Sequence, residues 1–209
     1  EEAELEHKVF PVNIGAGEQF RPEFLAIAPN NRIPAIVDRD PPGGGEPISV
    51  FESGAILFYL ARKVGKFVPQ DPRGTMDVLQ WLFWQVGGLG PMAGQNHHFN
   101  IYAPEKVPYA IDRYVNETAR LYGVLNRKLD GKEYVAGEYS IADMAIYPWI
   151  VPHENQRQNL NDFPHLKSWF ERVKARPAVI RAYESKESLY PPAKPMTDEE
   201  KAVLFNLKK

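Results

Sequence analysis

Cysteine is absent from the 209 residues of the chain. The chain therefore forms no disulfide, builds no thiolate metal site and has no cysteine nucleophile of its own. An excess of either charge is also lacking, because 25 Lys and Arg side chains are balanced by 27 Asp and Glu side chains, for a net charge of -2. This balance offers no basic surface for a phosphate backbone, so we expect no nucleic-acid partner.

Long hydrophobic runs are missing as well. The apolar segment 144–151 is far too short to cross a bilayer, so we expect no membrane partner. Positions 1, 2, 4 and 6 are acidic, whereas a secretory signal would begin with basic residues. Together these features predict a cytoplasmic protein.

The composition is that of a globular protein, with 44% hydrophobic, 12% aromatic and 25% charged residues. The length suits one large domain or two small ones. The pattern changes near residue 70, where short apolar runs separated by Gly and Pro give way to long helical periodicities. We therefore predict an α/β domain over residues 1–70 and an all-helical domain over residues 71–209.

The expected elements follow from these periodicities and from the turn residues between them. In the first domain we predict strands at 7–14, 33–38 and 48–51 and helices at 22–28 and 52–63. In the second we predict helices at 75–86, 108–129, 141–149, 166–175, 178–185 and from 197, with a break at 87–91. Residues 1–5 resemble the end of a helix, and a helix that leads into a strand normally follows another strand. We therefore expect one strand, central in the sheet, and most of a helix upstream of Glu1.

The segment NNRIPAIV at 30–37 is the first candidate site. If the Ile33–Pro34 bond is cis, the backbone of Ile33 turns outward and offers its N–H and C=O to a peptide-like ligand. Because only about 5–6% of X–Pro bonds in folded proteins are cis, the sequence by itself favours a trans proline that opens a strand.

The second candidate is Glu52-Ser53, where a strand leads into a helix. Free N–H groups at a helix start attract an anion, and Ser53 adds a hydroxyl donor. Glu52 suits this place if the ligand also carries an ammonium group, as an α-amino acid does. The simpler alternative is an ordinary N-terminal cap, and the spacing alone favours it.

Other motifs have simpler interpretations. Ser140 and Asp143 have the spacing of a capping box, for which we predict a purely structural role. His97 and His98 are adjacent and point in different directions, and no further ligand lies at a suitable spacing, so we predict no metal site. The glycines at 43–45 lack the Lys-Ser/Thr of a phosphate loop.

Taken in order, IPAIVD at 33–38, FESGAILFYLA at 51–61 and SIAD at 140–143 resemble the cytosolic glutathione transferases. Four longer strings, QFRPEF at 19–24, PNNRIPAIVD at 29–38, QWLFWQVGGLGPMAGQNHHF at 80–99 and PYAIDRY at 108–114, are similar to one subgroup. This is the nu-class, disulfide-bond oxidoreductase type of bacteria, related to the yeast nitrogen-regulator prion protein. The resemblance extends to about residue 186.

The resemblance implies a thioredoxin-like domain followed by an all-α domain, a homodimer, and glutathione as co-substrate. It also implies the glutathione-binding residues, which match the family motif position by position. Ile33 would pair its backbone with the cysteinyl unit, next to a cis Pro34. Glu52 and Ser53 would hold the γ-glutamyl end. Gln19 would bind near the glycine end with Arg32 as its neighbour, and Arg113 would reach the glutathione site from its own subunit or from the other one.

The activity implied is reduction of small disulfides by thiol–disulfide exchange with two glutathiones in one site. The absence of cysteine fits this activity, because both sulfurs then come from ligands. Two alternatives remain open: conjugation of glutathione to electrophiles, and a non-catalytic regulator that binds glutathione. The family's thiol-activating Thr or Asn follows its first strand, which we expect upstream of Glu1, so no residue of this chain is assigned that catalytic role.

Overall fold

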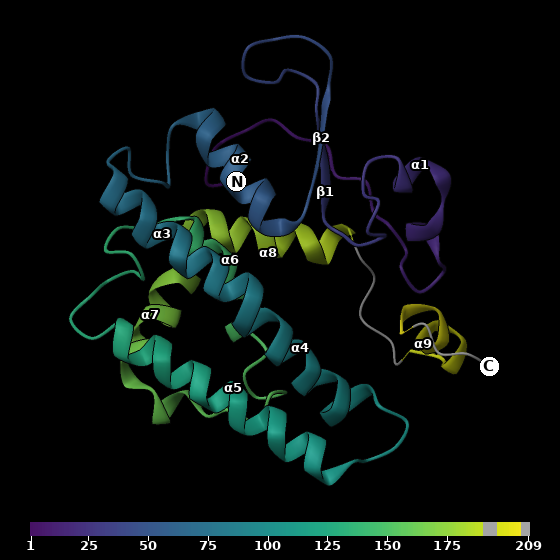
Figure 1. The fold of residues 1–209 in the computed structure, drawn as a ribbon, viewed down its shortest axis with the longest axis vertical. Coiled ribbons are helices and arrows are strands. Elements are labelled where there is room, and N and C mark those ends of the chain that lie inside the picture. Colours follow the sequence, from purple (N-terminus) through teal and green to yellow (C-terminus); the bar gives the residue numbers. More distant parts are fainter. Residues whose placement is uncertain (190–195, 206–209) are drawn as a thin grey trace. The chain divides into compact units, whose positions relative to one another are not determined.

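The computed structural model describes residues 1–189 and 196–205 (Figure 1). The chain divides into two compact units, residues 1–63 together with 177–209 and residues 64–176. The predicted fold class, a small α/β unit followed by a helical one, is confirmed. The domain limits 1–70 and 71–209 stay a prediction.

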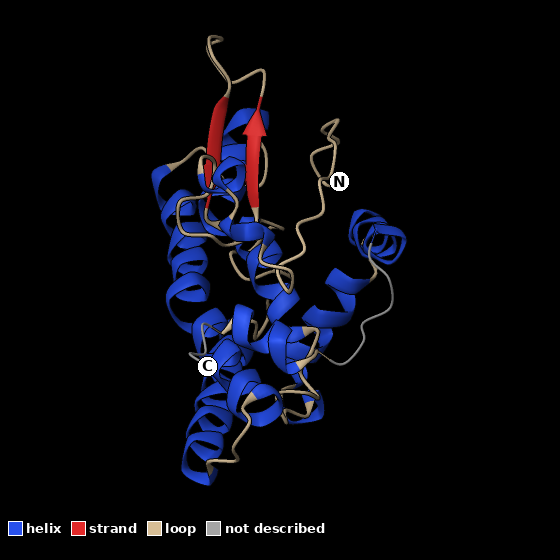
Figure 2. Ribbon diagram, turned by 90° about the vertical axis from the view of Figure 1, so that its right-hand side faces the viewer, coloured by secondary structure: helices blue, strands red, loops and turns tan. Residues whose placement is uncertain are grey.

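The first unit is built on an antiparallel hairpin, β1 (Ala35–Asp38) and β2 (Ile48–Phe51), which Figure 2 shows in red. Ala35 pairs with Phe51, so the start of β1 and the end of β2 lie at the same end of the hairpin. The chain enters α2 (Ser53–Val64) directly after β2. The unit also contains η1 (Glu18–Phe20), α1 (Pro22–Leu25), α8 (Pro177–Leu189) and α9 (Asp198–Leu204).

The predicted strand at 7–14 is wrong for the described structure, where this segment has no regular secondary structure. A strand exists only where its backbone groups pair with a neighbouring strand. β1 and β2 pair only with each other in the described part of the chain, so residues 7–14 have no strand as a partner. Val9 and Phe10 of this segment are 44% and 67% exposed.

The second unit is helical. It contains α3 (Pro72–Trp84), η2 (Gln85–Leu89), α4 (Gly90–His97), η3 (His98–Tyr102), α5 (Pro108–Lys128), α6 (Ile141–Ile150), η4 (Leu160–Asp162) and α7 (Pro164–Lys174). Apolar residues at helical spacing meet in one core, which includes Val78, Leu82, Leu121, Leu125, Ile146 and Trp169, each at most 2% exposed. Burial of these stripes is the main force that stabilises the helices.

The break predicted at 87–91 is a π-helical turn, η2, through which the helix continues into α4. Gly90 explains the close packing there, because a Cβ at this position would lie 3.2 Å from the ring of Trp149. The helix predicted at 141–149 is α6, which continues through Pro148 to Ile150. No helix among the described residues is long and apolar enough to span a membrane.

Candidate functional site

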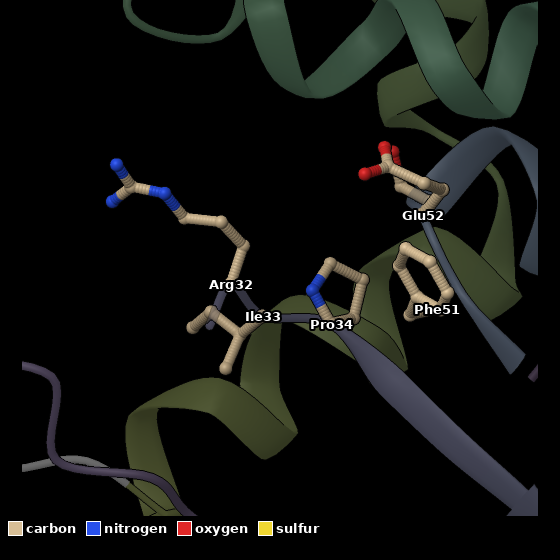
Figure 3. Close-up of a pocket in the computed structure, with 6 residues that line it drawn as sticks. Arg32, Ile33, Pro34, Phe51 and Glu52 are labelled. Carbon is tan, nitrogen blue, oxygen red and sulfur yellow. The ribbon is translucent and has the colours of Figure 1, made fainter. Parts of the chain in front are cut away.

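A small pocket of about 70 Å³ opens at the end of the hairpin where β1 begins and β2 ends (Figure 3). The antiparallel register brings the two chain segments together, although they are far apart in sequence. The pocket is lined by Arg32, Ile33, Pro34, Phe51, Glu52 and Ser53. Four of the six residues predicted to bind glutathione therefore lie around one cavity: Arg32, Ile33, Glu52 and Ser53.

The Ile33–Pro34 peptide bond is cis, as the resemblance implies and against the base rate for proline. Ile33 is 48% exposed, and among the described residues neither its N–H nor its C=O has a hydrogen-bond partner. An extended peptide ligand would satisfy both groups in the way that an added strand does.

Glu52 and Ser53 lie at the start of α2. The Glu52 carbonyl accepts a hydrogen bond from the Ile56 N–H at 2.9 Å, which places Glu52 at the N-cap position. Within the described structure neither side chain bonds to the first turn, so the N–H groups of Ser53, Gly54 and Ala55 have no protein acceptor. The side-chain cap that the spacing favoured is not formed, and the helix start is open to an anion.

The backbone of Glu52 has a φ of 69°, in the left-handed region that favours glycine. A non-glycine residue there costs free energy, and such residues gather at ligand sites. The Glu52 carboxylate accepts a hydrogen bond from Asn30 Nδ2 at 3.4 Å. Arg32 has no ion-pair or hydrogen-bond partner in the described chain. Figure 3 shows the Arg32 guanidinium and the Glu52 carboxylate at opposite ends of the pocket, with Pro34 between them.

A polar cluster joins the hairpin to α2 at the end of β1 opposite the pocket. Asp38, on β1, accepts hydrogen bonds from Lys63 Nζ at 2.6 Å and from the Tyr59 hydroxyl at 2.7 Å. The hydrogen bond from Lys63, and then that from Tyr59, holds the pKa of Asp38 below its usual range. Burial and the Asp38 carboxylate raise the pKa of Tyr59 to about 12. This cluster holds together the two elements that form the pocket.

Gln19 does not line this pocket. It is 3% exposed, its Nε2 donates to the Ile14 carbonyl at 3.1 Å, and its Oε1 is buried without a partner in the described structure. Arg113 lies on α5 in the second unit, where its guanidinium is 3.6 Å from Glu117. The binding roles of both residues stay predictions.

The predicted capping box at the start of α6 is confirmed. The Asp143 carboxylate accepts hydrogen bonds from the Val135 N–H, the Ser140 N–H, the Ser140 hydroxyl and the Trp169 indole N–H at 2.8–3.1 Å. Burial raises the pKa of Asp143, and these donors oppose the shift. All contacts are internal, which agrees with a structural role.

The sequence reasoning did not single out two residues of this region. Phe51 ended a predicted strand and began the matching string at 51–61, with no role of its own, although it lines the pocket. Asn30 was part of a matching string with no role of its own, although it contacts Glu52. The one feature of the sequence that could have pointed to Asn30 was its position three residues before Ile33, a predicted binding residue.

Family models match segments in both parts of the chain. Residues 1–62 match the family model for the glutathione S-transferase N-terminal domain, and residues 91–177 match the model for the C-terminal domain. The disulfide-bond oxidoreductase YfcG of Escherichia coli K12 is 57% identical over 183 residues, which cover 87% of this chain and 85% of that protein.

Two solved structures share the fold. A glutathione transferase from Burkholderia graminis, with two glutathione molecules bound per subunit, has a TM-score of 0.83 and 40% identity, covering 89% of this chain and 80% of that one. A glutathione transferase from Pseudomonas putida, with one glutathione disulfide bound per subunit, has a TM-score of 0.79 and 42% identity, covering 92% and 84%. The chain therefore belongs to the glutathione S-transferase family.

Proposed function

We propose that the chain binds glutathione in the pocket of the first unit and uses it to reduce small disulfides. The observation that carries this proposal is the convergence at one cavity of a free peptide edge at Ile33, an open helix start at Ser53 and the carboxylate of Glu52. The name of the Escherichia coli relative, a disulfide-bond oxidoreductase, supports the type of reaction.

The pocket suits the chemistry of a γ-glutamyl tripeptide. The α-carboxylate of the γ-glutamyl unit would receive hydrogen bonds from the N–H groups and hydroxyl at Ser53, and the ammonium group would meet Glu52. The peptide backbone of the cysteinyl unit would pair with Ile33. Arg32, a cation without a partner among the described residues, would attract the carboxylate of the glycine end, with Gln19 beside it. Arg113 would reach the same ligand.

The reaction is a pair of thiol–disulfide exchanges. A glutathione thiolate attacks one sulfur of the disulfide, forming a mixed disulfide and releasing the other sulfur as a thiol after protonation. A second glutathione thiolate then attacks the mixed disulfide at the glutathione sulfur, yielding glutathione disulfide and the second thiol. Two glutathiones are oxidised and one substrate disulfide is reduced. The chain contributes no sulfur, because it has no cysteine.

The test is turnover of a small mixed disulfide with glutathione by the full-length protein, together with calorimetric titration of glutathione. We expect turnover above the uncatalysed rate and two glutathiones per subunit at saturation. One glutathione per subunit, with turnover only on electrophiles, would instead indicate a conjugating transferase. Binding without any turnover would indicate a regulator, and no binding at all would contradict the pocket assignment.

We also propose a homodimer and a cytoplasmic location. Met76 and Phe83 are 50% and 67% exposed, and their spacing places them on the same face of α3. Such a face suits a second copy of the chain. Replacing Phe83 by Lys should shift the sedimentation profile from dimer toward monomer. A profile unchanged from that of the wild type would argue against this face as the dimer interface. Reduced glutathione is the expected thiol of a reducing compartment, which favours the cytoplasm.

A further inference from the structure

Asn30 is the one described residue whose side chain contacts the Glu52 carboxylate, and the function proposed above gives it no role. Its amide nitrogen Nδ2 lies 3.4 Å from Glu52 Oε1, across 22 residues of sequence. We propose that Asn30 is a positioning residue: it orients the Glu52 carboxylate toward the ammonium group of the bound ligand. This inference rests on the proposed function.

The turn that carries Asn30 is well anchored. Ala28 is completely buried, and its N–H bonds to the Phe24 carbonyl at 2.9 Å. Its own carbonyl accepts the Asn31 N–H at 2.9 Å, which closes the turn around Asn30. Asn31 has a φ of 47°, a left-handed conformation that asparagine tolerates better than most residues. Asn30 is therefore held by its backbone while its side chain remains exposed.

The side chain of Glu52 needs such a partner. Glu52 lines the pocket, but the bonds of its side chain beyond Cβ can still rotate. A flexible carboxylate must lose this freedom when it pairs with a ligand. A hydrogen bond from the Asn30 amide restrains the carboxylate in advance, so less ordering is required on binding. The amide is neutral, so the negative charge remains available to an ammonium group.

The experiment compares two substitutions that a merely structural role would rank in the opposite order. Asn30→Ala removes the donor, and we expect glutathione affinity to fall about two- to tenfold. Asn30→Asp keeps the shape but places a second negative charge beside Glu52, so its affinity should fall further. If Asn30 only filled space, the isosteric Asp would bind glutathione better than Ala does.

Matched controls are available at Asn155. It is exposed, and its side chain has no partner in the described structure. Asn155→Ala and Asn155→Asp should bind glutathione like the wild type. Circular dichroism and the thermal unfolding midpoint of each Asn30 variant confirm that the protein is folded before affinities are compared.

Two further measurements show that Asn30 acts through Glu52. In a Glu52→Gln background both Asn30 substitutions should lose most of their effect, since contacting residues are not additive. A glutathione analogue that lacks the γ-glutamyl amino group should bind equally well to wild type and to Asn30→Ala. Unchanged affinity in both variants, a milder effect of Asp than of Ala, or effects that persist in the Glu52→Gln background would each overturn the inference while leaving the proposed function intact. A wild-type protein that binds no glutathione would overturn both.

Discussion

Two helices of this molecule start with a similar pair of side chains, a hydroxyl and a carboxylate. The pair is buried and internally bonded at one helix start and exposed at the other. At the start of α6, Ser140 and Asp143 are buried, and every contact they make is internal. At the start of α2, Glu52 and Ser53 are exposed, and no side chain caps the first turn in the described structure. A buried polar group must find its partners within the protein, whereas an exposed one can leave them to water or to a ligand.

The comparison therefore teaches that burial, more than residue type, separates a folding motif from a binding site. The closed start of α6 contributes to stability, and substitutions there should lower the free energy of unfolding. The open start of α2 lies beside a cavity and a free peptide edge, and substitutions there should lower affinity and leave stability nearly unchanged.

The largest effect should come from Asp143→Ala, which breaks the closed arrangement. It would leave the Val135 N–H and the Trp169 indole N–H buried without acceptors. We expect the free energy of unfolding to fall by about 2–5 kcal/mol. Urea unfolding followed by tryptophan fluorescence measures this change. A loss below 1 kcal/mol would show that water replaces the carboxylate and that the helix start is open to solvent.

The next largest effect is expected at the open start of α2, on the affinity for glutathione. Glu52→Gln removes the charge that would meet the ligand's ammonium group, and we expect glutathione affinity to fall about 10- to 100-fold. The free energy of unfolding should change by less than about 0.5 kcal/mol, because the side chain is exposed. Calorimetric titration and urea unfolding of the same preparations give both values. A large loss of stability with normal affinity would reverse the assignment.

A paired serine experiment sharpens the comparison. Ser140→Ala removes an N-cap and should lower the free energy of unfolding by about 1 kcal/mol, with glutathione affinity unchanged. Ser53→Ala removes a donor at the pocket and should lower affinity about two- to tenfold, with stability unchanged. Opposite results from one substitution type at two helix starts would exclude a general effect of losing a hydroxyl. Equal stability losses would mean that Ser53 is an ordinary cap after all.

The closed start of α6 was predictable from sequence, and the open start of α2 only in part. A capping box spans four residues, so its spacing alone identifies it. The strand at 48–51 was predicted at its exact limits because Gly and Pro mark its start. The strand predicted at 7–14 failed because a strand depends on a neighbour that local pattern cannot reveal. Asn30 was missed for the same reason, since its partner is 22 residues away.

Asp38 provides the smallest and most specific test, because its carboxylate accepts a hydrogen bond from a charged partner, Lys63, whereas Asp143 uses neutral donors. The Lys63 hydrogen bond lowers the pKa of Asp38, so the folded state favours the ionised form. The contribution to stability is therefore present above the unfolded-state pKa of about 3.9 and is lost as the pH falls through the lower folded-state value.

Asp38→Asn should accordingly destabilise the protein by roughly 1 kcal/mol or less near pH 7, and the difference from wild type should shrink as the pH falls below about 4. Asp40→Asn is the matched control, because only the backbone carbonyl of Asp40 contacts Lys63. Urea midpoints for the three proteins at several pH values give the result. A stability difference that stays constant with pH would show that Asp38 contributes through shape and not through its charge, and the hairpin would then be held to α2 by packing alone.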